Sequence, residues 1–124
     1  MMLTFYHYAK CSTCIKAKRH LTALGHSLKE IDLTTDPPPA KELAALITKS
    51  GRPYTDFLNR SGVQYREENM KEKVKRLSEG EILRILASNG RLIKRPIVTD
   101  GKRVTVGFDA REFDTLWSTS LTVK

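Results

Sequence analysis

The segment Leu3-Thr4-Phe5-Tyr6-His7-Tyr8 leads to the turn Cys11-Ser12-Thr13-Cys14. The first of these segments is rich in aromatic and β-favouring residues, which predicts a strand. After the turn, apolar residues recur at steps of three and four, the period of a helix face. They are Cys14, Ala17, Leu21 and Leu24. Gly25 then follows as a stop signal. The beginning of the chain therefore predicts a strand, a cysteine turn and a helix.

Three further patterns extend this order. Residues 26–33 are typical of a second strand, and a helical crossover between the two strands would make them parallel neighbours. The prolines at 37–39 suit the entry to a helix that ends near Gly51. The apolar face of that helix consists of Leu43, Leu46 and Ile47. Residues 52–76 are polar and lack clear alternation, so we expect short helices and turns there.

The second half of the chain carries two helix starts and a hairpin. Ser78-Glu79-Gly80-Glu81 predicts a capping box for a helix that ends near Asn89-Gly90, and residues 109–112 predict a second box. Between these helices, residues 96–99 and 103–106 flank a turn that is typical of a β-hairpin. We expect a terminal helix after the hairpin, followed by a frayed polar tail.

This order of elements predicts an α/β fold. It fits a mixed four-stranded sheet with flanking helices, in a thioredoxin-like arrangement. The chain has 124 residues, the usual size of one domain, so we assign residues 1–124 to a single domain.

Composition excludes several classes of protein. The chain is 40% hydrophobic and 29% charged, which argues against collagen-like, coiled-coil and wholly disordered classes. Its N-terminus lacks the features of a signal peptide and no apolar run is long enough to cross a membrane, so we expect a cytoplasmic protein. The net charge of +8 favours anionic substrates, acidic protein partners or nucleic acid. Basic and acidic residues alternate around residues 67–76, however, which indicates a solvated helix rather than a direct nucleic-acid contact.

The turn from Cys11 to Cys14 is the strongest chemical signal. A thiol between a strand and a helix meets unpaired N–H groups and the positive end of the helix dipole, which favour the thiolate. Nearby basic residues add positive charge; they are Lys10, Lys16, Lys18 and Arg19. Cys14 belongs to the apolar stripe and should be the more buried thiol, suited to resolve an intermediate formed on Cys11.

Three plainer interpretations of the cysteines stay open. A zinc site needs about four ligands, and the chain adds to the pair only three histidines, whose spacing matches no common zinc finger. They are His7, His20 and His26. Two buried and inert cysteines are a second alternative. Incidental oxidation of the pair is the third.

A second candidate region contains Arg95 and Pro96. In a thioredoxin-like arrangement a proline that opens this strand faces the cysteine turn and is often cis. Arg95 would then point toward Cys11, where a guanidinium can hold a tetrahedral oxyanion or keep the thiolate charged. The alternative is a solvated arginine at a strand start. Arg60 carries no local feature that marks it as functional.

These segments resemble the arsenate reductase (ArsC) and Spx/MgsR family. The resemblance rests on four motifs: Tyr6 to Cys14, Phe57 to Arg60, Lys94 to Val98, and the turn Val106-Gly107-Phe108. It covers nearly the whole chain in order. It implies a thioredoxin-like core with a helical insertion between the second and third strands, at about residues 37–90.

In the arsenate reductases of this family, a cysteine matching Cys11 attacks arsenate, and arginines matching Arg60 and Arg95 hold the oxyanion. The intermediate is resolved by glutathione and glutaredoxin. This chain departs from that pattern twice, because a third arginine is replaced by Gly107 and a serine by Cys14.

Both departures resemble the Spx/MgsR branch, whose Spx regulators sense oxidation through a CxxC disulfide and bind the RNA polymerase α subunit. We therefore hold two hypotheses. The first is a thiol oxidoreductase in which Cys11 attacks and Cys14 resolves. The second is a redox-sensing transcriptional regulator. For the first we expect a monomer with no bound cofactor, a small oxyanion such as arsenate as substrate, and an external reductant from the glutaredoxin or thioredoxin system.

Overall fold

A computed structural model describes residues 2–118 of the chain. Most of the predicted frayed tail, residues 119–124, lies outside the described part. The core is a four-stranded sheet in the order β2-β1-β3-β4. Its strands are β1 (Met2–His7), β2 (Ser27–Asp32), β3 (Ile97–Thr99) and β4 (Val104–Val106).

The sheet is mixed, as the sequence predicts. β1 pairs with β2 in parallel, and Leu3 lies opposite Leu28. β3 pairs with both β1 and β4 in the antiparallel sense. The parallel pair needs a crossover, which the first helix supplies, and the antiparallel pair closes through the predicted hairpin.

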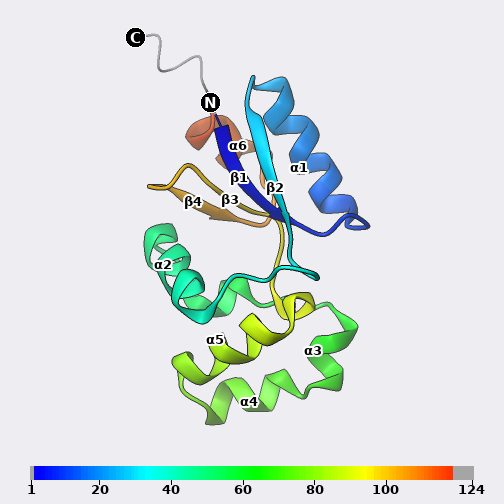
Figure 1. The fold of residues 1–124 in the computed structure, drawn as a ribbon, viewed down its shortest axis with the longest axis vertical. Coiled ribbons are helices and arrows are strands. Elements are labelled where there is room, and N and C mark those ends of the chain that lie inside the picture. Colours follow the sequence, from blue (N-terminus) through cyan, green and yellow to red (C-terminus); the bar gives the residue numbers. More distant parts are fainter. Residues whose placement is uncertain (1, 119–124) are drawn as a thin grey trace.

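The helices form two groups. α1 (Ser12–Ala23) and α6 (Ala110–Leu116) lie beside the sheet in the upper half of Figure 1. The second group lies between β2 and β3 in sequence and below the sheet in the figure. It contains α2 (Ala40–Ser50), η1 (Tyr54–Phe57), α3 (Val63–Glu67), α4 (Met70–Arg76), α5 (Glu79–Ser88) and η2 (Gly90–Leu92). We call this second group the helical insertion. The structure thus has the predicted fold, with the expected short helices in the polar middle of the chain.

Alternation along the strands gives each face of the sheet its own apolar cluster, since successive side chains point to opposite faces. Leu3 and Phe5 face α1 and α6, whereas Tyr6 faces the helical insertion. The first cluster contains Leu3, Phe5, Cys14, Ala17, Leu21, Val98, Phe113 and Trp117. The second cluster joins the other face to the helical insertion, so both parts of the chain share one core.

The helix starts show how local sequence sets the boundaries. The hydroxyl of Ser78 accepts a hydrogen bond from the Glu81 N–H at 3.2 Å, and the Glu81 carboxylate accepts one from the Ser78 N–H at 3.0 Å. The capping box predicted here is therefore complete. The capping box predicted at residues 109–112 forms only in part. Asp109 accepts from the Glu112 N–H at 3.1 Å, but the Glu112 carboxylate accepts from Arg52 at 2.8 Å instead of from the backbone. A guanidinium is the stronger donor, which explains the difference.

Gly90 marks a tight contact between the helical insertion and the sheet. A side-chain carbon at this position would overlap the carbonyl oxygen of Leu33, the residue that follows β2. The absence of a side chain therefore lets the start of η2 rest directly on the backbone beyond β2.

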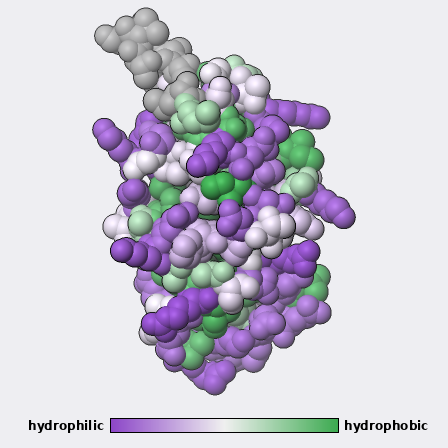
Figure 2. Space-filling model, viewed as in Figure 1, coloured by the Kyte–Doolittle hydropathy of each residue, from purple (hydrophilic) through white to green (hydrophobic). Residues whose placement is uncertain are grey.

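The surface in the view of Figure 2 is mostly hydrophilic, with hydrophobic side chains in small separate patches. Across residues 2–118, no helix is both long and apolar enough to cross a membrane.

Candidate active site

Cys11 is the N-cap residue of α1. Its extended backbone, with φ of −87° and ψ of 115°, brings the sulfur back over the first turn of the helix. There Cys11 Sγ accepts a hydrogen bond from the Cys14 N–H at 3.3 Å. A side-chain acceptor at this position satisfies one of the free N–H groups at the start of a helix. The sulfur therefore occupies the place where the helix stabilises negative charge.

The two thiols have opposite tendencies to ionise. Burial acts to raise the pKa of Cys11, but hydrogen bonds from the Cys14 thiol and N–H, together with the Arg95 guanidinium, outweigh burial and lower this pKa below its usual value. Cys14 is 2% exposed, as predicted for the more buried thiol. Burial and the hydrogen bond to Cys11 raise the pKa of Cys14 to about 12. Cys11 is thus the more readily ionised of the two sulfurs, and Cys14 stays protonated beside it.

Arg95 is held against the cysteine turn from a distant part of the sequence. The Arg95–Pro96 peptide bond is cis, the isomer that the thioredoxin-like arrangement predicts there. The guanidinium carbon lies 5.0 Å from the centre of the Tyr8 ring, and Nη1 donates to the Ile93 carbonyl at 3.3 Å. Arg95 Nε is buried and has no hydrogen-bond partner among residues 2–118. The side chain is therefore fixed in place while one of its donors is free.

A short pairing between two loops completes the site. An isolated bridge joins Leu58 and Ile93, the Asn59 N–H donates to the Leu92 carbonyl at 2.8 Å, and the Lys94 N–H donates to the Phe57 carbonyl at 2.8 Å. This pairing brings the segment after η1 beside the segment that leads to Pro96. Polar side chains from both segments consequently face the cysteine turn.

The Cys11 cavity, as we call it, has a volume of about 390 Å³. Its lining consists of Cys11, Thr13, Asn59, Ser61, Lys94, Arg95, Gly107 and Phe108. The lining contains two cationic side chains, three neutral polar ones and no acidic one. Such a cavity suits a small anion close to the Cys11 sulfur.

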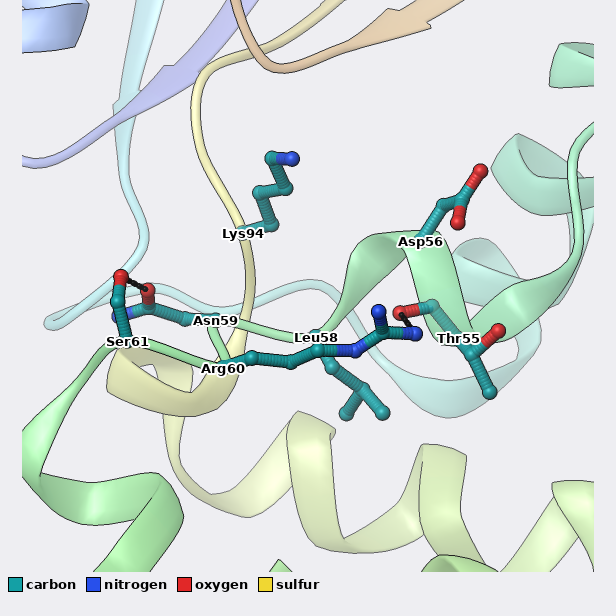
Figure 3. A pocket seen from close by; sticks show the side chains of 7 residues that line it. All are labelled: Thr55, Asp56, Leu58, Asn59, Arg60, Ser61 and Lys94. Carbon is teal, nitrogen blue, oxygen red and sulfur yellow. Dashed lines mark hydrogen bonds between the residues drawn. The ribbon is translucent and has the colours of Figure 1, made fainter. Parts of the chain in front are cut away.

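Arg60 lies outside the Cys11 cavity. Its guanidinium donates to the Thr55 carbonyl at 3.2 Å. Figure 3 shows the side chain extending toward Thr55 and away from Ser61, in a neighbouring cavity of about 210 Å³. The neighbouring cavity shares Asn59, Ser61 and Lys94 with the Cys11 cavity. The structure therefore unites Cys11, Cys14, Arg95 and Pro96, but it does not bring Arg60 to the same cavity, and the oxyanion-binding role of Arg60 stays a prediction.

The basic residues next to the turn contribute less to lowering the pKa of Cys11 than the sequence suggests. Lys18 pairs with Glu30 at 3.0 Å, and His7 lies 3.4 Å from the same carboxylate. These three residues line a separate cavity of about 250 Å³ on the Cys14 side of the turn. The positive charge that lowers the pKa of Cys11 comes from Arg95.

The described residues also bear on the zinc alternative. Within residues 2–118, no group of three or more histidine, cysteine or acidic side chains is placed to hold a metal ion. The two cysteines are free thiols that contact each other. The two side chains therefore lie near each other at the start of α1.

Comparison with known proteins identifies the family of the chain. The model of the ArsC family matches residues 6–116. The chain belongs to the ArsC family. It is 51% identical over 118 residues to the uncharacterized protein YusI of Bacillus subtilis, covering 95% of this chain and 100% of YusI.

The chain is also similar to a protein of known structure and to a regulatory protein. The crystal structure of an ArsC-family-related protein from Bacteroides fragilis is 39% identical and superposes with a TM-score of 0.88, covering 94% of this chain and 98% of that one. The regulatory protein MgsR of Bacillus subtilis is 26% identical over 110 residues, covering 89% of this chain and 86% of MgsR. The fold of this ArsC-family chain is thus that of its relatives, and one relative is a regulator.

Sequence reasoning missed Thr13, Asn59, Ser61 and Phe108 as cavity residues, and it assigned no role to the Lys94 side chain. Lys94 lies directly before Arg95 in the sequence, and that adjacency was the available signal. No local pattern indicates Asn59 or Ser61, because a long-range pairing of two loops places them there.

Proposed function

We propose that this protein is a thiol oxidoreductase of the arsenate reductase type, in which Cys11 is the nucleophile and Cys14 closes a disulfide with it. The observation that carries the proposal is the Cys11 sulfur itself. It caps α1, its pKa is lowered, and it opens into a cavity with the Arg95 guanidinium and no acidic residue. These features support attack on a small oxyanion.

The reaction balances with two thiols and no metal or bound cofactor. The Cys11 thiolate attacks arsenic(V) and forms a sulfur–arsenic bond, while one arsenate hydroxyl takes up a proton from solvent and leaves as water. The Cys14 sulfur then gives up its proton and attacks the Cys11 sulfur, so that the sulfur–arsenic bond breaks and its electron pair leaves with arsenic as arsenite. Arsenic gains two electrons and the two cysteines lose two. An external dithiol or glutathione system returns those electrons to the disulfide.

The contact between the two thiols supports the second step. The Cys14 thiol lies beside the Cys11 sulfur, which helps to raise its pKa, and burial keeps it protonated until Cys11 has reacted. When the adduct forms, Cys11 loses its negative charge, which removes one of the influences that hold the Cys14 pKa high. The fold therefore favours attack in the order Cys11 first and Cys14 second.

The test is a single turnover without added reductant. Reduced protein is mixed with arsenate, quenched with acid and alkylated, and the products are measured by mass spectrometry and arsenite analysis. We expect one arsenite and one Cys11–Cys14 disulfide per chain, and neither product with Cys11→Ser. Sulfate, which these thiols do not reduce, controls for oxidation by air. No arsenite above the sulfate control would contradict the proposal.

A second candidate function rests on the likeness to the regulator MgsR. In this alternative the same disulfide changes the binding of the chain to the RNA polymerase α subunit. A pull-down of the α C-terminal domain with reduced and oxidised protein tests it. Redox-dependent capture without arsenite formation would favour the regulator, whereas arsenite formation without capture would favour the reductase.

A further inference from the structure

The side chain of Lys94 lies over Gly107. The backbone of Gly107 is left-handed, with φ of +80°, and a side-chain carbon there would lie 3.1 Å from Lys94 Cε and 3.6 Å from Nζ. Lys94 therefore occupies the space that a side chain at position 107 would need. The glycine leaves room for the lysine to reach along the wall of the Cys11 cavity.

The ammonium group of Lys94 is unpaired. Over residues 2–118, the structure gives it neither a hydrogen bond nor an ion pair, although it lines both the Cys11 cavity and the neighbouring cavity. Figure 3 shows the Lys94 side chain projecting free of the labelled groups around it. Other lysines do have partners: Lys49 donates to the Gly101 carbonyl at 2.9 Å, for example.

No acidic side chain among the lining residues of the two cavities is placed to pair with the Lys94 ammonium group. The Cys11 cavity has no acidic lining residue. Asp56 lines the neighbouring cavity, but its carboxylate lies 3.5 Å from the guanidinium of Arg52. An unpaired ammonium on the wall of a small cavity attracts an anion, and its three donors rotate to suit a tetrahedral one.

We propose that Lys94, an unpaired cation on the wall of the Cys11 cavity, binds the incoming oxyanion. This inference rests on the proposed function and deepens it, because it assigns recognition of the substrate to a residue between η2 and β3. The two cations have different settings. Arg95 is half-buried, stacked on Tyr8 and counted among the causes of the lowered Cys11 pKa, whereas Lys94 is exposed and free.

The test measures anion binding without requiring turnover. Cys11 is alkylated with iodoacetamide at pH 6, and sulfate is added as a protecting anion over a range of concentrations. We expect Lys94→Gln to raise the sulfate concentration for half-protection roughly tenfold, the usual worth of one charge-assisted hydrogen bond. The pKa of Cys11, measured from the alkylation rate against pH, should stay at the wild-type value in this variant.

Lys41→Gln is the matched control. Lys41 is an exposed residue of α2 that lines none of these cavities, and its substitution removes the same unit of net charge. We expect its sulfate protection to match that of the wild type. A second probe is the ratio of the alkylation rates with iodoacetate and iodoacetamide, which should fall in Lys94→Gln alone because only the first reagent is an anion.

Two results would overturn the inference. Equal sulfate protection in Lys94→Gln and Lys41→Gln would remove the binding role. A rise in the Cys11 pKa of Lys94→Gln as large as that of an Arg95 variant would assign Lys94 to the sulfur instead. Neither readout depends on arsenate reduction, so the reductase proposal can fail in its single-turnover test while the role of Lys94 stands.

Discussion

The Cys11 cavity has two unlike sides. On the sulfur side, Cys11, Cys14 and Arg95 are buried or half-buried and are fixed by contacts with the cap of α1, the Tyr8 ring and the Ile93 carbonyl. On the insertion side, the polar groups come from a loop of the helical insertion and from Lys94, whose ammonium is exposed and unpaired in the described chain. The groups that lower the pKa of the proposed nucleophile thus belong to the core, whereas the side chains proposed to recognise the substrate lie at the surface.

Removing the second sulfur should have the largest effect. In Cys14→Ser the disulfide cannot form, but the serine hydroxyl can still donate to the Cys11 sulfur, so the first step should continue. We expect an arsenic adduct to accumulate on Cys11, with no arsenite released in the single turnover. Mass spectrometry of the intact protein measures the adduct. Arsenite yields equal to those of the wild type would mean that both steps need only one cysteine.

Gly90→Ala should destabilise the junction between the helical insertion and the sheet. The added methyl group would overlap the Leu33 carbonyl, so the start of η2 must move away from the sheet. We expect the free energy of unfolding to fall by about 3 kcal/mol or more. Urea denaturation measures the change, and Gly80→Ala, where a methyl group meets open space, is the matched control. Equal stability of the two variants would mean that the junction is not tightly packed.

Arg95 and Arg60 should differ in their effect on the sulfur. Removing the positive charge beside a thiolate disfavours the thiolate, so Arg95→Ala should raise the pKa of Cys11. A rise of about one unit lowers the rate of alkylation at pH 6 about tenfold. Arg60→Ala is the control, since its side chain lies in the neighbouring cavity. Equal rises of the Cys11 pKa in both variants would show that both arginines influence the ionisation of Cys11.

The last prediction is a loss of stability in alkali. The folded protein holds the pKa of Cys14 at about 12, whereas the unfolded thiol ionises at an ordinary ~8.5. Because the folded pKa is the higher one, this stabilisation is complete below pH 8 and is lost as the pH rises from there toward 12. The loss is at most about 1.4 kcal/mol per pH unit. The free energy of unfolding under reducing conditions should therefore fall less steeply between pH 9 and 11 in Cys14→Ala than in the wild type.

The parts of the fold that depend on local sequence were predictable. The apolar period after Cys14 predicts α1, and Ser78 with Glu81 predicts the start of α5, because these signals act within one or two helical turns. The hairpin turn predicts β3 and β4 for the same reason. The order of these elements then restricts the topology to few choices, of which the mixed sheet is one.

The site was predictable only where it follows from that fold. Cys11 and Arg95 come together because a thioredoxin-like sheet places the cysteine turn opposite the strand that begins after Pro96. The pairing of Leu58 with Ile93 has no local signal, so the approach of Asn59 and Lys94 could not be derived. The orientation of the Arg60 side chain likewise depends on its hydrogen bond to the Thr55 carbonyl, a contact that sequence patterns do not encode.

The capping role of Cys11 has a mechanical consequence. The atom that reacts is also the atom that accepts the N–H of Cys14 and so closes the first turn of α1. A neutral disulfide sulfur accepts such a bond less well than a thiolate, and a lost cap costs a helix about 1 kcal/mol. In the proposed reaction, disulfide formation at Cys11 therefore loosens the first turn of α1.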